Sequence, residues 1–250
     1  MDHITFRQTM DSLLTGRDPH RQLRKMAEDG VLKAHFPELD ALRGVVQPEK
    51  WHPEGDVFEH TLLMLSHMAW KSVILGWAVL LHDIGKPAAQ TFTPDGVPHF
   101  YGHEALGGDM APAILRRYGF TEEETLRIAT LVRNHMRYTH LHLARRKKQL
   151  KFLESPDLPL EMELHRLDCI SSNGIMENYV LLLDLKREWQ ETPPVPVPFL
   201  KGRDLLDLGF TPGPVFAKIL RDALECQKSG TITSRADALR WADALRDQTK

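Results

Sequence analysis

Residues 78–86 have the sequence AVLLHDIGK, an apolar run that ends in His82 and Asp83 and continues with Ile-Gly-Lys. Gly85 and Pro87 are typical of a helix stop, so we expect His82 and Asp83 in a last helical turn rather than in mid-helix. The dipeptide proves nothing by itself, because this composition gives about one His-Asp pair by chance. Whether it is half of a metal site depends on where the other candidate ligands lie.

The composition excludes several classes of protein. Lysine and arginine (32) nearly balance aspartate and glutamate (34), and the net charge of −2 argues against a nucleic-acid binder driven by overall charge. The N-terminus has no apolar signal core, and the longest apolar stretch, SVILGWAVLL at 72–81, is too short to span a bilayer. Cys169 and Cys226 lack C-x-x-C spacing, which indicates neither a disulfide framework nor a cysteine zinc site. We therefore expect a soluble, cytoplasmic protein without membrane association.

The fold class follows from the spacing of the apolar residues. They recur three and four positions apart through most of the chain, which predicts an all-α protein with one small hairpin in TFTPDGVPHFY, residues 91–101. Asp56 with Glu59, and Thr121 with Glu124, have the spacing of a helix N-cap and capping box. Each pair predicts a helix start.

Three regions are expected along the chain. Residues 1–50 are an N-terminal helical segment, residues 51–190 the main domain, and residues 191–250 a proline-rich linker with a small helical C-terminal appendage. The boundary rests on ETPPVPVPFL at 191–200, because its four prolines enforce an extended connection.

Three further residues are candidate metal ligands, because helix periodicity turns them toward a core. His60 lies in the first turns of the helix that starts at Asp56, His135 follows Leu131 by four positions, and Asp168 adjoins an apolar stripe. Each one alone is more often a core or rim residue satisfied by a neighbouring carbonyl. Together they indicate a site for Mn, Fe, Co, Ni or Zn, with Mg if fewer histidines bind.

The order of these residues resembles the HD superfamily of metal-dependent phosphohydrolases, in which a histidine, a His-Asp pair and a last aspartate follow one another. A subset of that superfamily has two extra histidines, and His103 in FYGHEALGG and His135 in LVRNHMR match their positions. The resemblance implies an HD-domain helical bundle with one or two divalent ions. It implies one metal on His60, His82, Asp83 and Asp168, and another on Asp83, His103 and His135, with Asp83 bridging.

A narrower resemblance covers about residues 30–245. GVVQPEKWHPEGDVFEHTL, HDIGKP, FYGHE, LVRNHMR and GRDLLDLGFTPGPVFAKILRDAL are similar to the C-terminal HD portion of bacterial tRNA nucleotidyltransferases and poly(A) polymerases. The nucleotidyltransferase head of those enzymes, with its paired-aspartate metal motif, has no counterpart in the sequence. We therefore expect a free-standing HD module and do not expect nucleotide addition to tRNA.

Phosphoester hydrolysis needs a nucleophile at neutral pH and a means to absorb charge on the phosphoryl oxygens. A metal-activated hydroxide would supply the first, which makes Asp83 and Lys86 the predicted catalytic residues, with Lys86 also binding a phosphate oxygen. Arg133 and Arg137 flank His135 and are predicted substrate-binding residues, with a solvated helix face as the alternative.

Other residues have weaker functional readings. Four histidines could orient ligands or protonate a leaving group, although each is more often an ordinary surface residue: His52, His99, His140 and His165. The basic run ARRKKQLK at 144–151 could hold RNA, but it contains no aromatic residue and favours a solvated helix. Trp51, Trp70 and Trp77 are expected in the core rather than as base-stacking platforms.

The sequence thus predicts a metal-dependent phosphohydrolase, either a phosphomonoesterase or a phosphodiesterase, that acts on a nucleotide or an RNA end. One alternative keeps the chemistry but changes the substrate to a dinucleoside polyphosphate or a nucleoside monophosphate. The other is a non-catalytic module, derived from a tRNA nucleotidyltransferase, that binds RNA or a partner protein and keeps a structural metal. The complete ligand set and Lys86 favour the enzyme.

Overall fold

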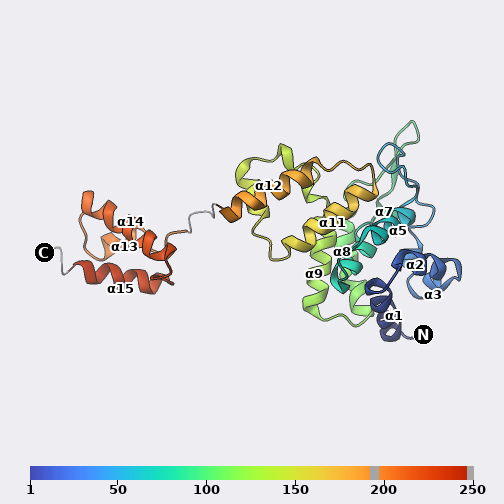
Figure 1. Ribbon diagram of the computed structural model, residues 1–250, viewed down its shortest axis with the longest axis horizontal. Helices are drawn as coiled ribbons and strands as arrows, with labels where there is room; N and C mark the ends of the chain where they lie inside the picture. Colours follow the sequence, from blue (N-terminus) through green and yellow to red (C-terminus); the bar gives the residue numbers. More distant parts are fainter. Residues whose placement is uncertain (192–196, 247–250) are drawn as a thin grey trace. The chain divides into compact units, whose positions relative to one another are not determined.

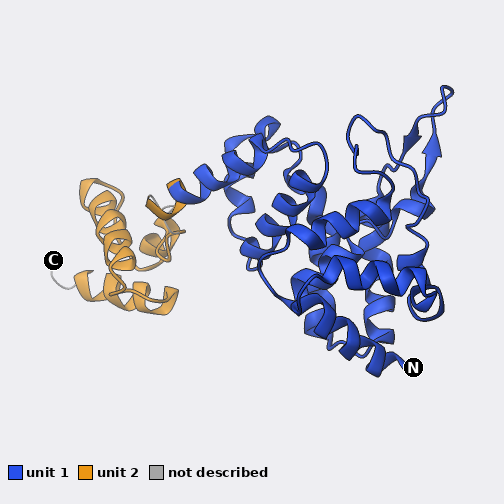
Figure 2. Cartoon of the chain, turned by 45° about the vertical axis from the view of Figure 1, so that its right-hand side comes forward, with its two compact units in different colours: residues 1–187 blue, residues 188–250 orange. Residues whose placement is uncertain are grey.

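The computed structural model describes residues 1–191 and 197–246 (Figure 1). The chain divides into two compact units, residues 1–187 and residues 188–250 (Figure 2). The all-α prediction is confirmed, since helices build both units and the described residues form a single two-stranded sheet. In this described part of the chain, no helix has the length and apolar character needed to cross a lipid bilayer.

The elements before residue 192 are α1 (His3–Thr15), α2 (Pro19–Glu28), α3 (Val31–His35), α4 (Pro37–Asp40), α5 (Val57–His67), α6 (Val73–Leu81), α7 (Lys86–Ala89), β1 (Thr91–Phe92), β2 (Pro98–His99), α8 (His103–Arg117), α9 (Glu122–Asn134), the 3₁₀ turns η1 (His135–Tyr138) and η2 (Leu141–Leu143), α10 (Arg146–Phe152), α11 (Leu158–Ser171) and α12 (Glu177–Glu191). Those after residue 196 are α13 (Gly202–Asp207), α14 (Pro214–Lys228) and α15 (Arg235–Arg246).

Helix α6 is the centre of the first unit. Every residue from Leu75 to Leu81 is buried, and helices α1, α5, α9 and α11 all contact α6. The N-terminal helix α1 contributes Phe6 and Met10 to the same core, so residues 1–50 pack inside the first unit. Because α6 is surrounded, the residues that follow its C-terminal end are also enclosed.

The tryptophan prediction is correct for one residue and wrong for two. Trp77 is fully buried, and its indole nitrogen donates a 2.7 Å hydrogen bond to Asp11. Trp51 and Trp70 are about half exposed, because they lie in the loops on either side of α5 and not on a helix face.

The predicted helix starts at Asp56 and Thr121 are both present. Thr121 and Glu124 form the full capping box. Asp56 caps α5 by accepting a hydrogen bond from the Glu59 amide, but the Glu59 carboxylate binds the Arg24 guanidinium at 2.6 Å. Only half of the expected box therefore forms at Asp56, since a cation on α2 takes the carboxylate.

The helix stop after the His-Asp pair is also present, for a different reason than expected. Gly85 has φ of −80°, so it is not a left-handed cap. A Cβ at Gly85 would lie 2.3 Å from the carbonyl oxygen of His103 and 2.8 Å from the amide nitrogen of Gly107. The missing side chain lets the start of α7 lie directly against the backbone of α8.

The predicted hairpin connects α7 to α8. Strand β1 pairs antiparallel with β2, Thr91 opposite His99 and Phe92 opposite Pro98, and Gly96 turns the chain with φ of +78°. Residues 100–102 then lead into His103, the first residue of α8.

Helices α13, α14 and α15 form the predicted C-terminal helical appendage around their own apolar core, which includes Leu205, Ile219 and Ala242. The boundary between the units falls after residue 187, near the predicted one at 190. Residues 192–196, the centre of the predicted extended linker, lie outside the described residues.

We expect Gly85→Ala to destabilise the first unit by about 1–3 kcal/mol, because its Cβ would meet backbone atoms that cannot move independently of α8. Urea denaturation followed by circular dichroism measures the free energy of unfolding. Gly202→Ala is the control, since its Cβ would meet only the Phe216 ring at 3.5 Å. Equal stability of Gly85→Ala and wild type would show that α7 and α8 are not in close contact.

Candidate metal centre

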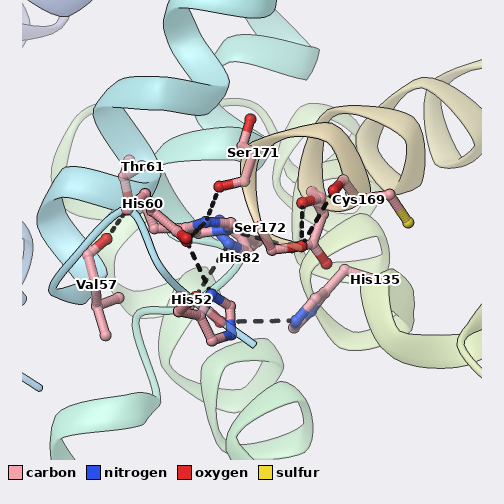
Figure 3. A network of polar contacts seen from close by, with 12 residues as sticks. His52, Val57, His60, Thr61, His82, His135, Cys169, Ser171 and Ser172 are labelled. Atoms are coloured by element: carbon pink, nitrogen blue, oxygen red, sulfur yellow. Dashed lines mark hydrogen bonds and ion pairs between the residues drawn. The ribbon is translucent and has the colours of Figure 1, made fainter. Parts of the chain in front are cut away.

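Helix ends bring the candidate ligands together. His60 lies in the first turn of α5, His82 and His135 follow the last residues of α6 and α9, and His103 begins α8, while Asp168 comes from α11. Figure 3 shows the imidazoles of His60, His82 and His135 gathered between these helices, beside Ser171 and Ser172. Residues more than 100 positions apart therefore meet at one place.

Asp83 is the hub of this cluster. Its side chain is only 2 % exposed, and its carboxylate oxygens lie 3.1 Å from His82 Nε2, 3.2 Å from His103 Nε2 and 3.8 Å from His135 Nε2. The Nε2 atoms of His103 and His135 are themselves 3.2 Å apart. Three imidazoles thus present the same ring nitrogen to one buried carboxylate.

These three histidines share one orientation. In each, Nδ1 lies 2.7–2.8 Å from the backbone carbonyl oxygen three residues earlier: Val79 for His82, Phe100 for His103 and Val132 for His135. A carbonyl oxygen only accepts hydrogen bonds, so each Nδ1 carries a proton and Nε2 is the ring nitrogen that faces Asp83. When Nε2 is deprotonated, this orientation presents its lone pair to a metal.

His60 is oriented by a carboxylate. Its Nδ1 lies 2.6 Å from Glu54 Oε1 and 3.2 Å from the Ser171 carbonyl, and its Nε2 lies 3.2 Å from Asp168 Oδ1. Glu54 Oε1 also lies 2.9 Å from His52 Nδ1. His52 thus contacts the carboxylate that orients His60, which is compatible with the ligand-orienting role that the sequence suggested for His52. Sequence reasoning missed Glu54, although a carboxylate just before the helix cap at Asp56 was a usable signal.

Lys86 lies inside the cluster. Its side chain is 7 % exposed, and its ammonium is 2.6 Å from Asp83 Oδ2 and 2.6 Å from Gln47 Oε1. Gln47 was also missed, and nothing in its sequence context singles it out. A buried lysine beside the hub adds a fixed positive charge to the site.

The two predicted substrate-binding arginines have partners within the protein. Arg133 binds Asp109 on α8, and both side chains are exposed. Arg137 binds the buried carboxylate of Glu161 at 2.9 and 3.0 Å, and Tyr138 also donates to Glu161. The substrate-binding role of both arginines stays a prediction.

The remaining candidates lie around the cluster without joining it. His165 is buried and its ring packs against Tyr138, while His99 stacks on Tyr101. The basic run forms α10, which buries none of its residues, in agreement with a solvated helix.

The buried groups of the cluster shift one another's pKa values in different directions. Burial alone would raise the pKa of Asp83, but the nearby His82 and Lys86 hold it well below its usual range. Burial would lower the pKa of His60, yet the neighbouring carboxylates of Asp168 and Glu54 raise it to about 9. His135 has the opposite balance, since burial and the charge of His82 lower its pKa to about 3.

The residues fit a divalent metal. Three groups of three have ligand atoms within 4.8 Å of one another: His52, Glu54 and His60; His60, His82 and Asp83; and Asp83, His103 and His135. The Nε2 atoms of His60 and His82 are buried and make no hydrogen bond of good geometry among the described residues, although each lies just over 3 Å from a carboxylate oxygen. Imidazole and carboxylate donors suit divalent first-row metals. The last two groups contain five of the six predicted ligands and share Asp83, whereas Asp168 is in none of the groups. The assignment of each ligand to a metal stays a prediction.

Comparison with known proteins agrees with this arrangement. Residues 57–172 match the model of the HD domain family. The A-adding tRNA nucleotidyltransferase of Deinococcus radiodurans is 30% identical over 95% of this chain and 58% of its own length. The CC-adding tRNA nucleotidyltransferase of Thermus thermophilus is 31% identical over 86% of this chain and 50% of its own length. The multifunctional CCA protein of an Azoarcus species is 37% identical over 47% of this chain and 29% of its own length. The chain spans about half the length of the first two relatives.

We expect Glu54→Gln to weaken binding of Mn²⁺ about 10- to 100-fold, because the carboxylate that orients His60 becomes an amide. Isothermal titration of the full chain measures the affinity. Glu59→Gln is the matched control, since Glu59 lies on α5 beside His60 but its carboxylate pairs with Arg24 at the surface. Equal affinities of Glu54→Gln and wild type would exclude His60 as an oriented ligand.

Proposed function

The chain contains an HD domain and is homologous to tRNA nucleotidyltransferases, and on that premise we propose that it is a metal-dependent phosphohydrolase for a phosphoester of a nucleotide or an RNA end. The observation that carries the proposal is the convergence of imidazole Nε2 atoms on the buried Asp83 carboxylate, with Lys86 beside it. Among the described residues, the Nε2 atoms of His60 and His82 make no hydrogen bond of good geometry, which supports a role as metal ligands.

Each residue has a role in the proposed reaction. His60, His82, Asp83, His103, His135 and Asp168 would hold one or two divalent ions. A divalent ion in this position supplies a Lewis acid that lowers the pKa of water toward about 7 and neutralises phosphoryl oxygens. Asp83 keeps the centre anionic, and Lys86, fixed by Gln47, places an ammonium where a phosphate oxygen would lie.

The two arginines differ in how readily they could bind substrate. The pair of Arg133 and Asp109 is exposed, and such a pair is weak enough to exchange for a phosphate. The partner of Arg137, Glu161, is buried and also accepts hydrogen bonds from Tyr138 and Ser155. We therefore propose Arg133 as the substrate contact and Arg137 as a residue that fixes η1 to α11.

The alternative functions keep specific support. The names of two of the relatives refer to tRNA, and the exposed basic helix α10 would suit an RNA backbone, so an RNA-binding module with a structural metal is the second candidate. A dinucleoside polyphosphate or a nucleoside monophosphate would suit the same centre. A cytoplasmic location is part of the proposal in either case.

The test compares the rates at which wild type and Asp83→Asn hydrolyse four kinds of substrate: 2′,3′-cyclic nucleotides, nucleoside monophosphates, dinucleoside polyphosphates and a generic phosphodiester. Each substrate is tested with Mn²⁺, Ni²⁺, Co²⁺ and Mg²⁺. We expect turnover in wild type and its loss, with loss of metal binding, in Asp83→Asn, because the shared ligand is removed. Circular dichroism should show unchanged helix content.

Asp29→Asn is the control, since it neutralises an exposed carboxylate that pairs with Lys25 outside the cluster. Turnover retained in Asp83→Asn would refute the proposed centre. Tight RNA binding by wild type without turnover in any metal would favour the non-catalytic module.

A further inference from the structure

Two segments next to the candidate metal centre contact its side chains: the loop before α5 and the end of the hairpin. The loop before α5 contributes Gln47, which binds Lys86, and Glu54, which binds His60. The hairpin side contributes Phe100, whose carbonyl accepts from His103 and whose ring lies 5.5 Å from the Lys86 ammonium. Both segments therefore contact side chains of the centre, and Figure 2 shows the hairpin extending from the body of the first unit.

Tyr101 follows Phe100 in the second segment and is exposed. It is 82 % exposed, whereas His103, two residues later, is only 7 % exposed. Gly102 separates them with φ of +75°, a backbone conformation that few other residues adopt, and so turns one side chain outward and the next inward. At most about 7 Å of chain joins the two Cα atoms, so the exposed ring stays close to a candidate ligand.

The Tyr101 ring has one aromatic neighbour. It stacks on His99 with ring planes 10° apart and centroids 5.2 Å apart, and His99 is itself paired with Thr91 in the hairpin. At 82 % exposure most of the Tyr101 residue stays open to solvent. The contact with His99 orients the ring, which lowers the entropic cost of stacking on a planar partner.

We propose that Tyr101 is a specificity-determining residue that stacks on the nucleobase of a nucleotide whose phosphate lies at the metal centre. This inference rests on the proposed function, which supplies the phosphate site. Nucleobases commonly stack on exposed aromatic side chains, and this one stands beside a site with a buried ammonium suited to phosphate. The base would extend the existing stack of His99 and Tyr101.

The test compares a ligand with a base to a ligand without one. Isothermal titration in the presence of Mn²⁺ would use adenosine 5′-phosphorothioate, a slowly hydrolysed nucleotide, and ribose 5-phosphate. We expect Tyr101→Ala to weaken nucleotide binding about 5- to 150-fold and to leave ribose 5-phosphate binding unchanged. Tyr101→Phe should bind the nucleotide like wild type, because it keeps the ring.

Trp70→Ala is the matched control, because Trp70 is another exposed aromatic residue. It lies in the loop between the last residue of α5 and the first residue of α6, whereas His60 lies near the start of α5 and His82 follows the end of α6. Equal weakening of both ligands in Tyr101→Ala, or no change in either, would overturn the inference. A change only in oligomeric state, measured by light scattering, would also overturn it and make Tyr101 a contact between copies.

The outcome is separable from that of the proposed function. A base-dependent loss of binding in Tyr101→Ala without turnover of any phosphoester would support the stacking role while refuting the hydrolase. If wild type turns over a phosphoester, and Tyr101→Ala has the same ratio of nucleotide affinity to ribose 5-phosphate affinity as wild type, the hydrolase is supported and the stacking role is refuted.

Discussion

The burial of the Asp83 carboxylate constrains the rest of the first unit. An ionised carboxylate in a protein interior is stable only when positive charge and hydrogen bonds surround it. Here the compensation comes from Lys86 at 2.6 Å and from imidazoles on helices α6 and α8, and at the end of α9. These helices must therefore end or begin at one point, and their packing around the fully buried α6 makes that possible.

The backbone does part of the chemistry at this point. The carbonyls that bind His82 and His135 belong to the last turns of α6 and α9, where carbonyl groups lack their full set of helical partners. The same groups that end each helix thus fix the proton on Nδ1 and leave Nε2 for a ligand. His60 lies in the first turn of α5, and its Nδ1 contacts Glu54 and the Ser171 carbonyl instead.

Two glycines, Gly85 and Gly102, shape the chain on either side of the hairpin. Gly85 lets α7, which begins at Lys86, lie against α8, while Gly102 turns the chain between the exposed Tyr101 and the inward His103. One glycine is required for its size and the other for its backbone conformation. The proposed phosphate site and the proposed base site therefore depend on two residues that have no side chain.

The sequence by itself determined the helical class, the helix starts at Asp56 and Thr121, the hairpin and the positions of the six candidate ligands, because these depend on local spacing and on a motif with fixed order. It also indicated the last-turn position of the His-Asp pair. Only the tertiary structure decided that Glu54 and Gln47 support the site, that Arg137 is bound to Glu161, and that Trp51 and Trp70 are exposed. Those facts depend on which loops and helices meet in space, and local spacing carries no information about such contacts.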